Sequence, residues 1–526
     1  MTLLRVAGLH VDIHGRPILR GVHVEMPEGG VFGLVGESGS GKSMTALALM
    51  GLMPAGARAT GTAEFDGQNL LTLDEQRLRS LRGNELGMIF QEPMTALNPL
   101  QTIGDQVAET LLIHGAVGRR EARAVARETL NRVGLDASRF ALERYPHELS
   151  GGQRQRVSIA MAIALRPRLL IADEPTTALD VTTQAGILEL LRALVDSEGM
   201  GLLLITHDLA VVAEMAAHVA VMQEGRIVEA GPTEELFRTR SHAYTKTLFA
   251  ASEYTRARTS REVRETVLRV QAATRDHRLP RNNLFSPPGR LRAVDQVSLE
   301  VRRGESVGLV GESVCGKSTL SRAILGLETL QGGAIEIGGS PVLAPRVPAD
   351  LRRRMQVVFQ DPFGSFNPRH RVCRLIAEPF HLTGRPEDAE VRIDQVLADV
   401  GLSSRDKHKY IHEFSGGQRQ RIAIARALIT RPDLIVLDEA VSALDVRVRA
   451  QVLDLLADLQ ETYGLSYLFI SHDLSVVRAV TDRVLVMQAG RIVESGPTGE
   501  VFADPAHPYT KALIHAVPRI PDAWRA

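Results

Sequence analysis

The sequence contains the same phosphate-binding pattern twice. GESGSGKS occupies residues 36–43 and GESVCGKS occupies residues 311–318. Glycines let successive backbone N–H groups curl round an anion, and a helix that follows directs its positive end at the same anion. A lysine in such a loop reaches the terminal phosphates of a nucleotide, and a serine ligates Mg²⁺. The residues expected in these roles are Lys42, Ser43, Lys317 and Ser318.

Each loop is followed by an apolar run that ends in an Asp-Glu pair. RLLIADE ends at Asp173 and Glu174, and DLIVLDE ends at Asp438 and Glu439. A carboxylate buried at the end of a strand needs a partner, and Mg²⁺ can be that partner. The glutamate that follows stands where a base could orient the attacking water. On its own such a pair more often begins a loop, so the functional reading depends on its spacing from the other motifs.

That spacing is conserved between the two copies in the second half of each repeat. From Ser150 to Asp173 is 23 residues, as is the step from Ser415 to Asp438. The next step, from the aspartate to a histidine, is 34 residues in both copies and ends at His207 and His472. The step from the first glycine of the loop to a lone glutamine differs, at 55 residues for Gln91 and 49 for Gln360. We therefore expect a rigid chemical part and a more variable middle part in each copy.

An SGGQ tetrad precedes a helical pattern in both copies, at residues 150–153 and 415–418. A serine hydroxyl and glycine amides at a helix N-terminus form a second anion site. The alternative is an ordinary helix cap with flexible glycines, which a single tetrad would favour.

Length and composition indicate two large α/β halves. The chain has 526 residues, 44% hydrophobic content, 62 Lys and Arg against 62 Asp and Glu, and two cysteines. The balanced charge gives no reason to expect a nucleic-acid partner, and the few cysteines fit a reducing cytosol. No run approaches the roughly 20 apolar residues that cross a bilayer. Any transport pore would therefore belong to other chains.

Alternating strand and helix patterns predict a largely parallel core sheet with an inserted helical subdomain in each half. The start of the sequence, LLRVAGLHV at 3–11, resembles VLRVQAATR at 267–275. We therefore predict a first domain at 1–251, a polar linker at 252–265 and a second domain at 266–526, each domain ending in a short C-terminal extension.

These motifs together resemble the ATP-binding-cassette (ABC) ATPases over nearly the whole chain. LSGGQ at 149–153 and FSGGQ at 414–418 match the signature of that family. The resemblance implies hydrolysis of ATP with Mg²⁺, and a head-to-tail arrangement in which each ATP meets the phosphate loop of one domain and the signature of the other. One site would combine Lys42, Gln91, Asp173, Glu174 and His207 with Ser415 and Gly417. The other would combine Lys317, Gln360, Asp438, Glu439 and His472 with Ser150 and Gly152.

The family's residue roles transfer onto the matching positions. Glu174 and Glu439, with His207 and His472 at the γ-phosphate, are the expected catalytic residues. Ser43, Gln91, Ser318 and Gln360 are the expected Mg²⁺ contacts, with Asp173 and Asp438 nearby. The loops add the expected nucleotide contacts Gly36, Ser38, Gly39, Gly41, Gly311, Ser313 and Gly316. Asp180 and Asp445 match the family loop that crosses between domains.

Two further segments narrow the resemblance to the ATPases of oligopeptide, dipeptide and nickel importers. QEPMTALNP (91–99) and QDPFGSFNP (360–368) look like that group's extension of the glutamine loop. GPTEELFRTRSHAYTKTL (231–248) and GPTGEVFADPAHPYTKAL (496–513) look like its C-terminal extension. This implies two membrane permeases, which dock beside the glutamine loops, and a substrate-binding protein on the far side. The chain would then lie at the cytoplasmic face of the membrane. Some members carry an iron–sulfur cluster near this extension, but no cysteine follows Cys373, so we predict none.

Several alternatives stay open. A soluble tandem cassette acting on ribosomes or DNA is disfavoured by the short linker, the balanced charge and the two cysteines. An exporter ATPase is disfavoured by the two importer-like segments. The expected solute is a dipeptide or oligopeptide, the largest class in the family, and the alternatives are an opine, a metallophore or nickel. Val314, in place of the glycine that the first copy keeps at Gly39, predicts a weaker second site. His14 is the candidate to stack on adenine in the first half, with no candidate in the second.

Overall fold

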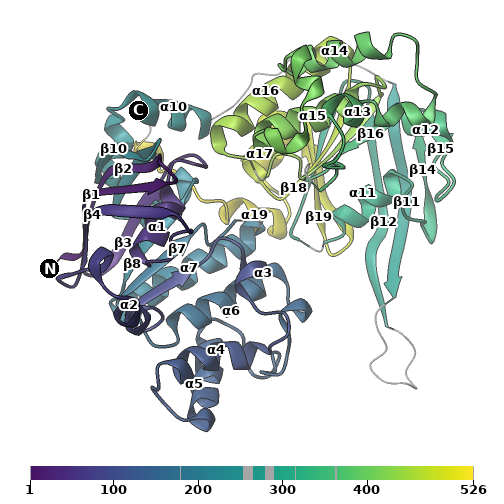
Figure 1. Cartoon of the computed structure of the whole chain (residues 1–526). Helices are drawn as coiled ribbons and strands as arrows, with labels where there is room; N and C mark the ends of the chain where they lie inside the picture. Colours follow the sequence, from purple (N-terminus) through teal and green to yellow (C-terminus); the bar gives the residue numbers. More distant parts are fainter. Residues whose placement is uncertain are drawn as a thin grey trace. The chain divides into compact units, whose positions relative to one another are not determined.

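A computed structural model describes residues 2–177, 179–252, 265–278, 289–313, 315–361, 364–442 and 444–524 (Figure 1). The chain divides into two compact units. The first comprises Met1–Leu179, Thr183–Glu253 and Pro518–Ala526, and the second comprises Asp180–Thr182 and Tyr254–Val517. The predicted linker lies almost wholly outside the described residues, and the predicted domain boundaries remain predictions.

Each unit contains a six-stranded, mostly parallel sheet and a four-stranded antiparallel sheet. The central strands are short apolar runs in which every residue is buried, because helices cover a parallel sheet on both faces. In the first unit the large sheet has the order β10 (Arg226–Pro232), β9 (His218–Gln223), β3 (Gly30–Val35), β8 (Gly201–Thr206), β7 (Leu169–Asp173), β6 (Leu86–Ile89). The small sheet has the order β2 (Arg16–Pro27), β1 (Thr2–Ile13), β4 (Ala57–Phe65), β5 (Gln68–Asn69).

The second unit repeats both sheets with the same topology. Its large sheet has the order β16 (Met355–Val358), β17 (Leu434–Asp438), β18 (Ser466–Ser471), β13 (Ser306–Val310), β19 (Arg483–Gln488), β20 (Arg491–Pro497). Its small sheet has the order β12 (Arg290–Arg302), β11 (Thr266–Arg278), β14 (Gly332–Ile337), β15 (Ser340–Pro341). The predicted parallel core and the predicted first strand of each half are confirmed.

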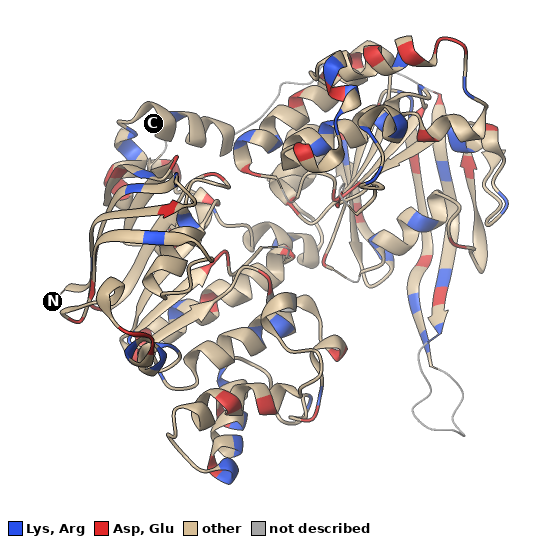
Figure 2. Cartoon of the chain, in the orientation of Figure 1, with Lys and Arg blue, Asp and Glu red and all other residues tan. Residues whose placement is uncertain are grey.

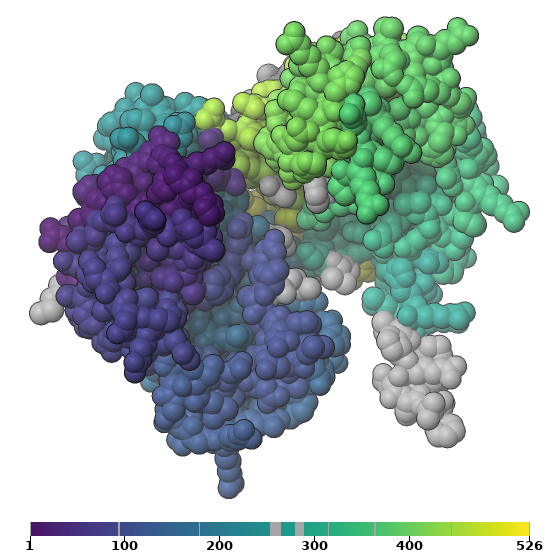
Figure 3. Space-filling model, in the orientation of Figure 1, coloured from purple at the N-terminus to yellow at the C-terminus, as the bar shows by residue number. Residues whose placement is uncertain are grey.

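Three sets of helices occur in both units alongside the others, and the predicted helical insertion is confirmed. One helix follows the phosphate loop, a group lies between the glutamine and the SGGQ tetrad, and a pair closes the C-terminal extension. In the first unit the insertion forms a lobe that includes α4 and α5 (Figures 1 and 3). The helices of the first unit are α1 (Lys42–Leu49), α2 (Glu75–Leu81), α3 (Pro93–Ala96), α4 (Ile103–Ile113), α5 (Arg119–Arg132), α6 (Gly151–Ile163), α7 (Val181–Glu198), α8 (Leu209–Met215), α9 (Thr233–Thr239) and α10 (Ala243–Ser252).

The helices of the second unit follow in the same order. They are α11 (Lys317–Ile324), α12 (Ala349–Arg354), α13 (Val372–Ile376), α14 (Ala389–Asp399), α15 (Gly416–Leu428), α16 (Val446–Tyr463), α17 (Leu474–Val480), α18 (Thr498–Ala503) and α19 (Pro508–His515).

The C-terminal segment of the chain is part of the first unit. Ile520 is buried in a cluster with Phe237 and Phe249 of α9 and α10. The Trp524 ring lies edge-on to Phe237, with 5.9 Å between the ring centroids, and its carbonyl accepts a hydrogen bond from Arg240. The second unit's own extension has a separate cluster built around Val501, Leu513 and Ile514 of α18 and α19.

Charges of both signs are interspersed along both units (Figure 2). Within the described ranges, no helix is both long enough and apolar enough to cross a membrane.

Candidate nucleotide-binding sites

Each phosphate loop joins the end of a buried parallel strand to the start of a helix. β3 ends at Val35 and α1 begins at Lys42, while β13 ends at Val310 and α11 begins at Lys317. The last glycine of each loop, Gly41 or Gly316, has φ near +110° (108° and 110°). A Cβ at Gly316 would lie 2.0 Å from the carbonyl oxygen of Ala293, so only glycine fits there.

The loop lysines are buried and held by the loop itself. Lys42 donates from Nζ to the carbonyls of Gly36 (2.7 Å) and Glu37 (2.8 Å). Lys317 does the same to Gly311 (2.6 Å) and Glu312 (2.7 Å). Each lysine is 5% exposed. The two loops therefore present a cationic head in the same position relative to their own backbone.

The aspartates that end β7 and β17 have the properties of cation ligands. Burial raises the pKa of Asp173, and the neighbouring Ser43 hydroxyl partly offsets this effect. Burial also raises the pKa of Asp438, which accepts a hydrogen bond from Ser321 at 3.2 Å. Oδ1 of Asp173 is buried and has no hydrogen-bond partner among the described residues. A buried carboxylate oxygen without a partner is costly, so this site fits Mg²⁺, which prefers oxygen ligands.

Two of the expected side chains, Gln91 and His207, contact Glu174. Gln91 donates from Nε2 to Oε2 of Glu174 at 3.0 Å, and His207 Nδ1 lies 3.2 Å from Oε1. Burial would raise the pKa of Glu174, but His207, the Thr177 hydroxyl and Lys42 outweigh it and lower the pKa to about 2. The carboxylate is therefore ionised at neutral pH and can accept a hydrogen bond from a water molecule.

Glu439 has the corresponding arrangement with one difference. His472 Nδ1 lies 3.2 Å from its Oε1, and the pKa of Glu439 is also lowered, because His472 and Lys317 outweigh the effect of burial. Gln360, in contrast to Gln91, makes no side-chain hydrogen bond within the described part of the chain. Both glutamates have positive φ, 47° for Glu174 and 52° for Glu439. Such backbone strain in a non-glycine residue clusters at functional sites.

The SGGQ tetrads form capping boxes at the start of α6 and α15. Ser150 accepts a hydrogen bond from the backbone N–H of Gln153, whose side chain accepts one from the Ser150 N–H. Ser415 and Gln418 form the same pair. The serine and the following glycine, Gly151 or Gly416, are exposed at the helix start. The structure therefore shows that the SGGQ tetrads cap these helices, whereas anion binding by the tetrads remains a prediction.

The sequence analysis missed a tyrosine that contacts each phosphate loop from the C-terminal extension. The hydroxyl of Tyr244 accepts a hydrogen bond from the N–H of Glu37 at 3.2 Å, and that of Tyr509 accepts one from Glu312 at 3.0 Å. A signal was available, because AYTK and PYTK recur with their tyrosines 13 residues after Gly231 and Gly496.

His14, the candidate to stack on adenine in the first unit, lies in the turn between β1 and β2. The His14 ring covers Gly56, where a Cβ would lie 2.3 Å from Cε1 of His14. In the second unit His277 Nε2 lies 3.2 Å from the hydroxyl of Thr319, in the first turn of α11. His277 therefore lies beside the phosphate loop helix and is the candidate that sequence comparison did not supply.

Val314 lies outside the described residues. Its counterpart Gly39 has φ of 76° and open space around the position of a Cβ. A β-branched residue is strained at such a φ, which is the physical basis for expecting a weaker second site.

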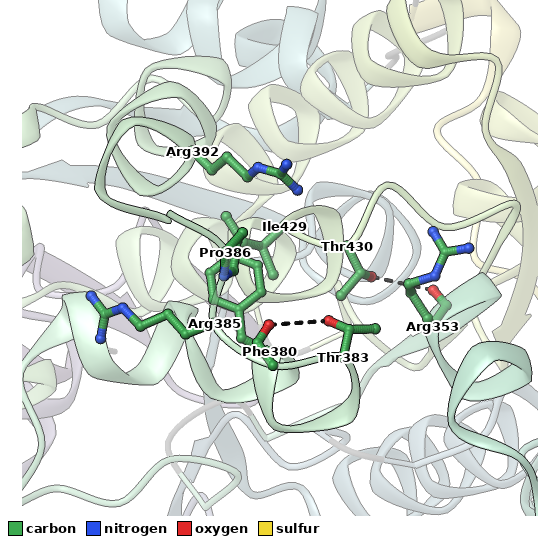
Figure 4. A pocket seen from close by; sticks show the side chains of 9 residues that line it. Arg353, Phe380, Thr383, Arg385, Pro386, Arg392, Ile429 and Thr430 are labelled. Carbon is green, nitrogen blue, oxygen red and sulfur yellow. Dashed lines mark hydrogen bonds between the residues drawn. The ribbon is translucent and has the colours of Figure 1, made fainter. Parts of the chain in front are cut away.

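A pocket of about 320 Å³ lies in the second unit, away from these residues (Figure 4). Its lining includes Arg353, Arg385 and Arg392, and each forms an ion pair, with Asp350, Glu390 and Asp388 respectively. The charges are balanced locally, so we assign this pocket no role in nucleotide chemistry.

Comparison with known proteins identifies the family. The ABC transporter family matches residues 19–177 and 294–442. The oligopeptide/dipeptide transporter C-terminal region matches residues 228–276 and 493–526. The peptidoglycan transport ATP-binding protein YejF of Agrobacterium fabrum is 47% identical over 98% of this chain and 96% of its own length. The glutathione import ATP-binding protein GsiA of Escherichia coli K12 is 44% identical over 95% of this chain and 86% of its own. A solved dimeric ATP-binding cassette, MJ0796 bound to ADP and Pi, aligns with 44% of this chain and 98% of its own, with 29% identity and a TM-score of 0.40.

Fold and sites together define a tandem ATP-hydrolysing cassette protein. Both halves also carry the C-terminal region of the oligopeptide and dipeptide transporters. The chain belongs to the ABC transporter family, as an ATP-binding subunit of the oligopeptide/dipeptide importer type.

Proposed function

We propose that this chain uses ATP at two sites to drive import of short peptides or closely related solutes through two membrane permeases. The observation that carries the proposal is the cluster of Gln91, Glu174 and His207 beside Lys42. The second unit repeats the glutamate–histidine pair and the nearby lysine, as Glu439, His472 and Lys317. Both glutamates also have positive φ, and backbone strain of this kind clusters at functional sites.

In each site different residues have different roles. The buried lysine and the loop N–H groups hold the phosphates, and Mg²⁺, held by Ser43 or Ser318 with Asp173 or Asp438 nearby, would neutralise their charge. The ionised Glu174 or Glu439 orients the attacking water, and its paired histidine fixes the direction of the carboxylate. The family resemblance supports a second contact to each ATP from Ser150 and Gly152 or from Ser415 and Gly417 of the other domain.

The solute class rests on the relatives. One is named for peptidoglycan transport and another for glutathione import, and the C-terminal regions match the oligopeptide and dipeptide type. Peptides and peptide-containing solutes are what these names have in common. We infer that the chain lies at the cytoplasmic face of the membrane and that the permeases dock beside its glutamine loops. A substrate-binding protein would be the partner on the far side of the membrane. We infer no iron–sulfur cluster.

The test is ATPase activity of the chain co-expressed with its permeases, in lipid, with a binding protein loaded from a peptide mixture. We expect stimulation only by the loaded binding protein, and mass spectrometry of the bound material identifies the solute. The double variant Glu174→Gln, Glu439→Gln is the control for contaminating ATPases. Activity that is indifferent to permeases and binding protein would overturn the importer function and favour a soluble tandem cassette.

A further inference from the structure

Two tyrosines connect the C-terminal extensions to the phosphate loops. The hydroxyl of Tyr244 in α10 accepts a hydrogen bond from the N–H of Glu37, 207 residues away in the sequence. The hydroxyl of Tyr509 in α19 accepts one from the N–H of Glu312, 197 residues away. Each contact lies within one unit, and it is built independently in both. A contact that recurs across such separations is part of the design of each unit rather than a local turn.

The tyrosine and the loop lysine hold opposite ends of the same loop residue. The N–H of Glu37 donates to Tyr244, while the carbonyl of Glu37 accepts from Lys42 Nζ at 2.8 Å. In the second unit the N–H of Glu312 donates to Tyr509, and its carbonyl accepts from Lys317 at 2.7 Å. Loss of the hydroxyl would therefore release the backbone segment on which the ammonium group rests.

The tyrosines themselves are firmly placed. Tyr244 is 6% exposed and packs in the cluster of Phe237 and Phe249. Its backbone N–H donates to Nδ1 of His242 at 3.2 Å, and the N–H of His242 donates to the Glu229 carboxylate at 3.1 Å.

The second unit repeats this chain of contacts. The N–H of Tyr509 donates to Nδ1 of His507 at 3.2 Å, and the N–H of His507 donates to Glu494 at 3.0 Å. Glu229 and Glu494 lie in β10 and β20, so the hydroxyls are tied to the large sheets. Burial raises the pKa of Tyr509, which keeps its hydroxyl neutral.

We propose that Tyr244 and Tyr509 are positioning residues for ATP, through which the C-terminal extension sets the shape of the phosphate loop. The proposal rests on the proposed function only in that ATP binds these loops. A preorganised loop binds phosphate without paying to order its backbone, so the hydroxyl contributes to ATP affinity and not to the chemical step.

The test compares hydroxyl losses at different places in the full chain. Tyr244→Phe combined with Tyr509→Phe removes both loop contacts and keeps both rings. The matched controls are Tyr463→Phe and Tyr467→Phe, which remove hydroxyl bonds to Asp399 (2.6 Å) and to the Leu456 carbonyl (2.8 Å) elsewhere in the second unit. All variants are assayed for ATP hydrolysis as a function of ATP concentration and for Tm.

We expect the loop variant to raise KM for ATP about two- to tenfold, the range for one lost hydrogen bond, with kcat within about twofold of the unmodified chain. The controls should lower Tm to a similar extent and leave KM unchanged. An unchanged KM in the loop variant, or an equal rise in the controls, would overturn the positioning role. If the unmodified chain hydrolyses no ATP under any condition, the proposed function fails instead.

Discussion

In the first unit His207 Nδ1 lies 3.2 Å from Glu174, and in the second His472 Nδ1 lies 3.2 Å from Glu439. The segment that follows each glutamine contrasts with this agreement. Asn98 and Asn367 each accept a hydrogen bond, at 3.0 Å, from the N–H two residues on, so the backbone turns alike. The side chains presented differ: Leu100, Gln101, Thr102 and Asp105 in the first unit, and Arg369, His370, Arg371 and Arg374 in the second.

The difference in surface character is large. Leu100 is 85% exposed, while Arg369, Arg371 and Arg374 are exposed and form no ion pair within the described residues. At these four positions the formal charge is −1 in the first unit and +3 in the second, with histidine neutral. The glutamate–histidine pair is thus alike in the two halves, whereas the surface beside the glutamine, where we place the permeases, differs in charge. The comparison predicts that the halves share one chemistry but offer different surfaces to their partners.

The largest effect should come from removing the catalytic carboxylates. We expect Glu174→Gln to lower kcat for ATP hydrolysis about a hundredfold or more, because a positioned base is worth about 10² to 10⁴. Glu439→Gln should lower kcat by a smaller factor if Val314 already weakens the second site. Equal losses from the two variants would show that the two sites are equivalent in turnover.

Exchange of the loop residue should test that asymmetry directly. Gly39 has φ of 76°, so Gly39→Val should weaken ATP binding about tenfold, since strain of this kind costs about 1–3 kcal/mol. The reciprocal Val314→Gly should tighten binding at the second site. Titration of each variant with a fluorescent ATP analogue measures the effect, and Gly39→Val with normal affinity would contradict it.

The charge contrast beside the glutamines predicts that the permeases are not interchangeable. Arg369→Leu with Arg371→Thr should reduce co-purification of one permease about fivefold, more strongly at low salt, and leave the other unchanged. Leu100→Arg should affect only the other permease. Arg405→Leu, an exposed arginine elsewhere in the second unit, is the control for loss of charge. Equal loss of both permeases would mean that the charges do not select partners.

The ion pair at Glu174 predicts a pH dependence of stability. Its folded-state pKa, about 2, lies below the ordinary value of 4.5, so the ionised carboxylate stabilises the fold above about pH 4.5. That contribution is lost as the pH falls towards 2. The Tm difference between the unmodified chain and Glu174→Gln should therefore shrink as the pH falls from about 5 to about 3. A difference that grows on acidification would reverse the assigned direction.

The smallest effect concerns the C-terminal segment, which packs against the C-terminal extension of the first unit. Trp524 is the only tryptophan of the chain, so its emission reports this contact in the full protein. Ile520→Asp should detach the segment and raise acrylamide quenching of Trp524 about twofold, because burial of an apolar side chain holds the contact. Ala523→Ser, at an exposed position, should change nothing. Unchanged quenching in Ile520→Asp would show that Ile520 does not hold the segment.

Much of the fold could be predicted because it depends on local patterns. The apolar runs that became β7 and β8, and the hairpin of β9 and β10 that turns at Glu224 and Gly225, are visible in sequence, since buried parallel strands and tight turns have strong compositional signals. The convergence on Glu174 was foreseen only through family resemblance. Spacing places residues at the ends of strands but does not state which side chains meet.

The sequence by itself determined the phosphate loops, the Asp-Glu strands and the capped signature helices, because each is a short segment whose residues act on their own backbone. Only the tertiary structure decided that Tyr244 and Tyr509 reach loops about 200 residues away, and that Ile520 and Trp524 complete the first unit's core. Such contacts depend on where whole elements pack, and burial of apolar surface has no preferred direction along the chain. The hydroxyl that holds each loop is therefore placed by the packing of the C-terminal extension and not by any motif beside the loop.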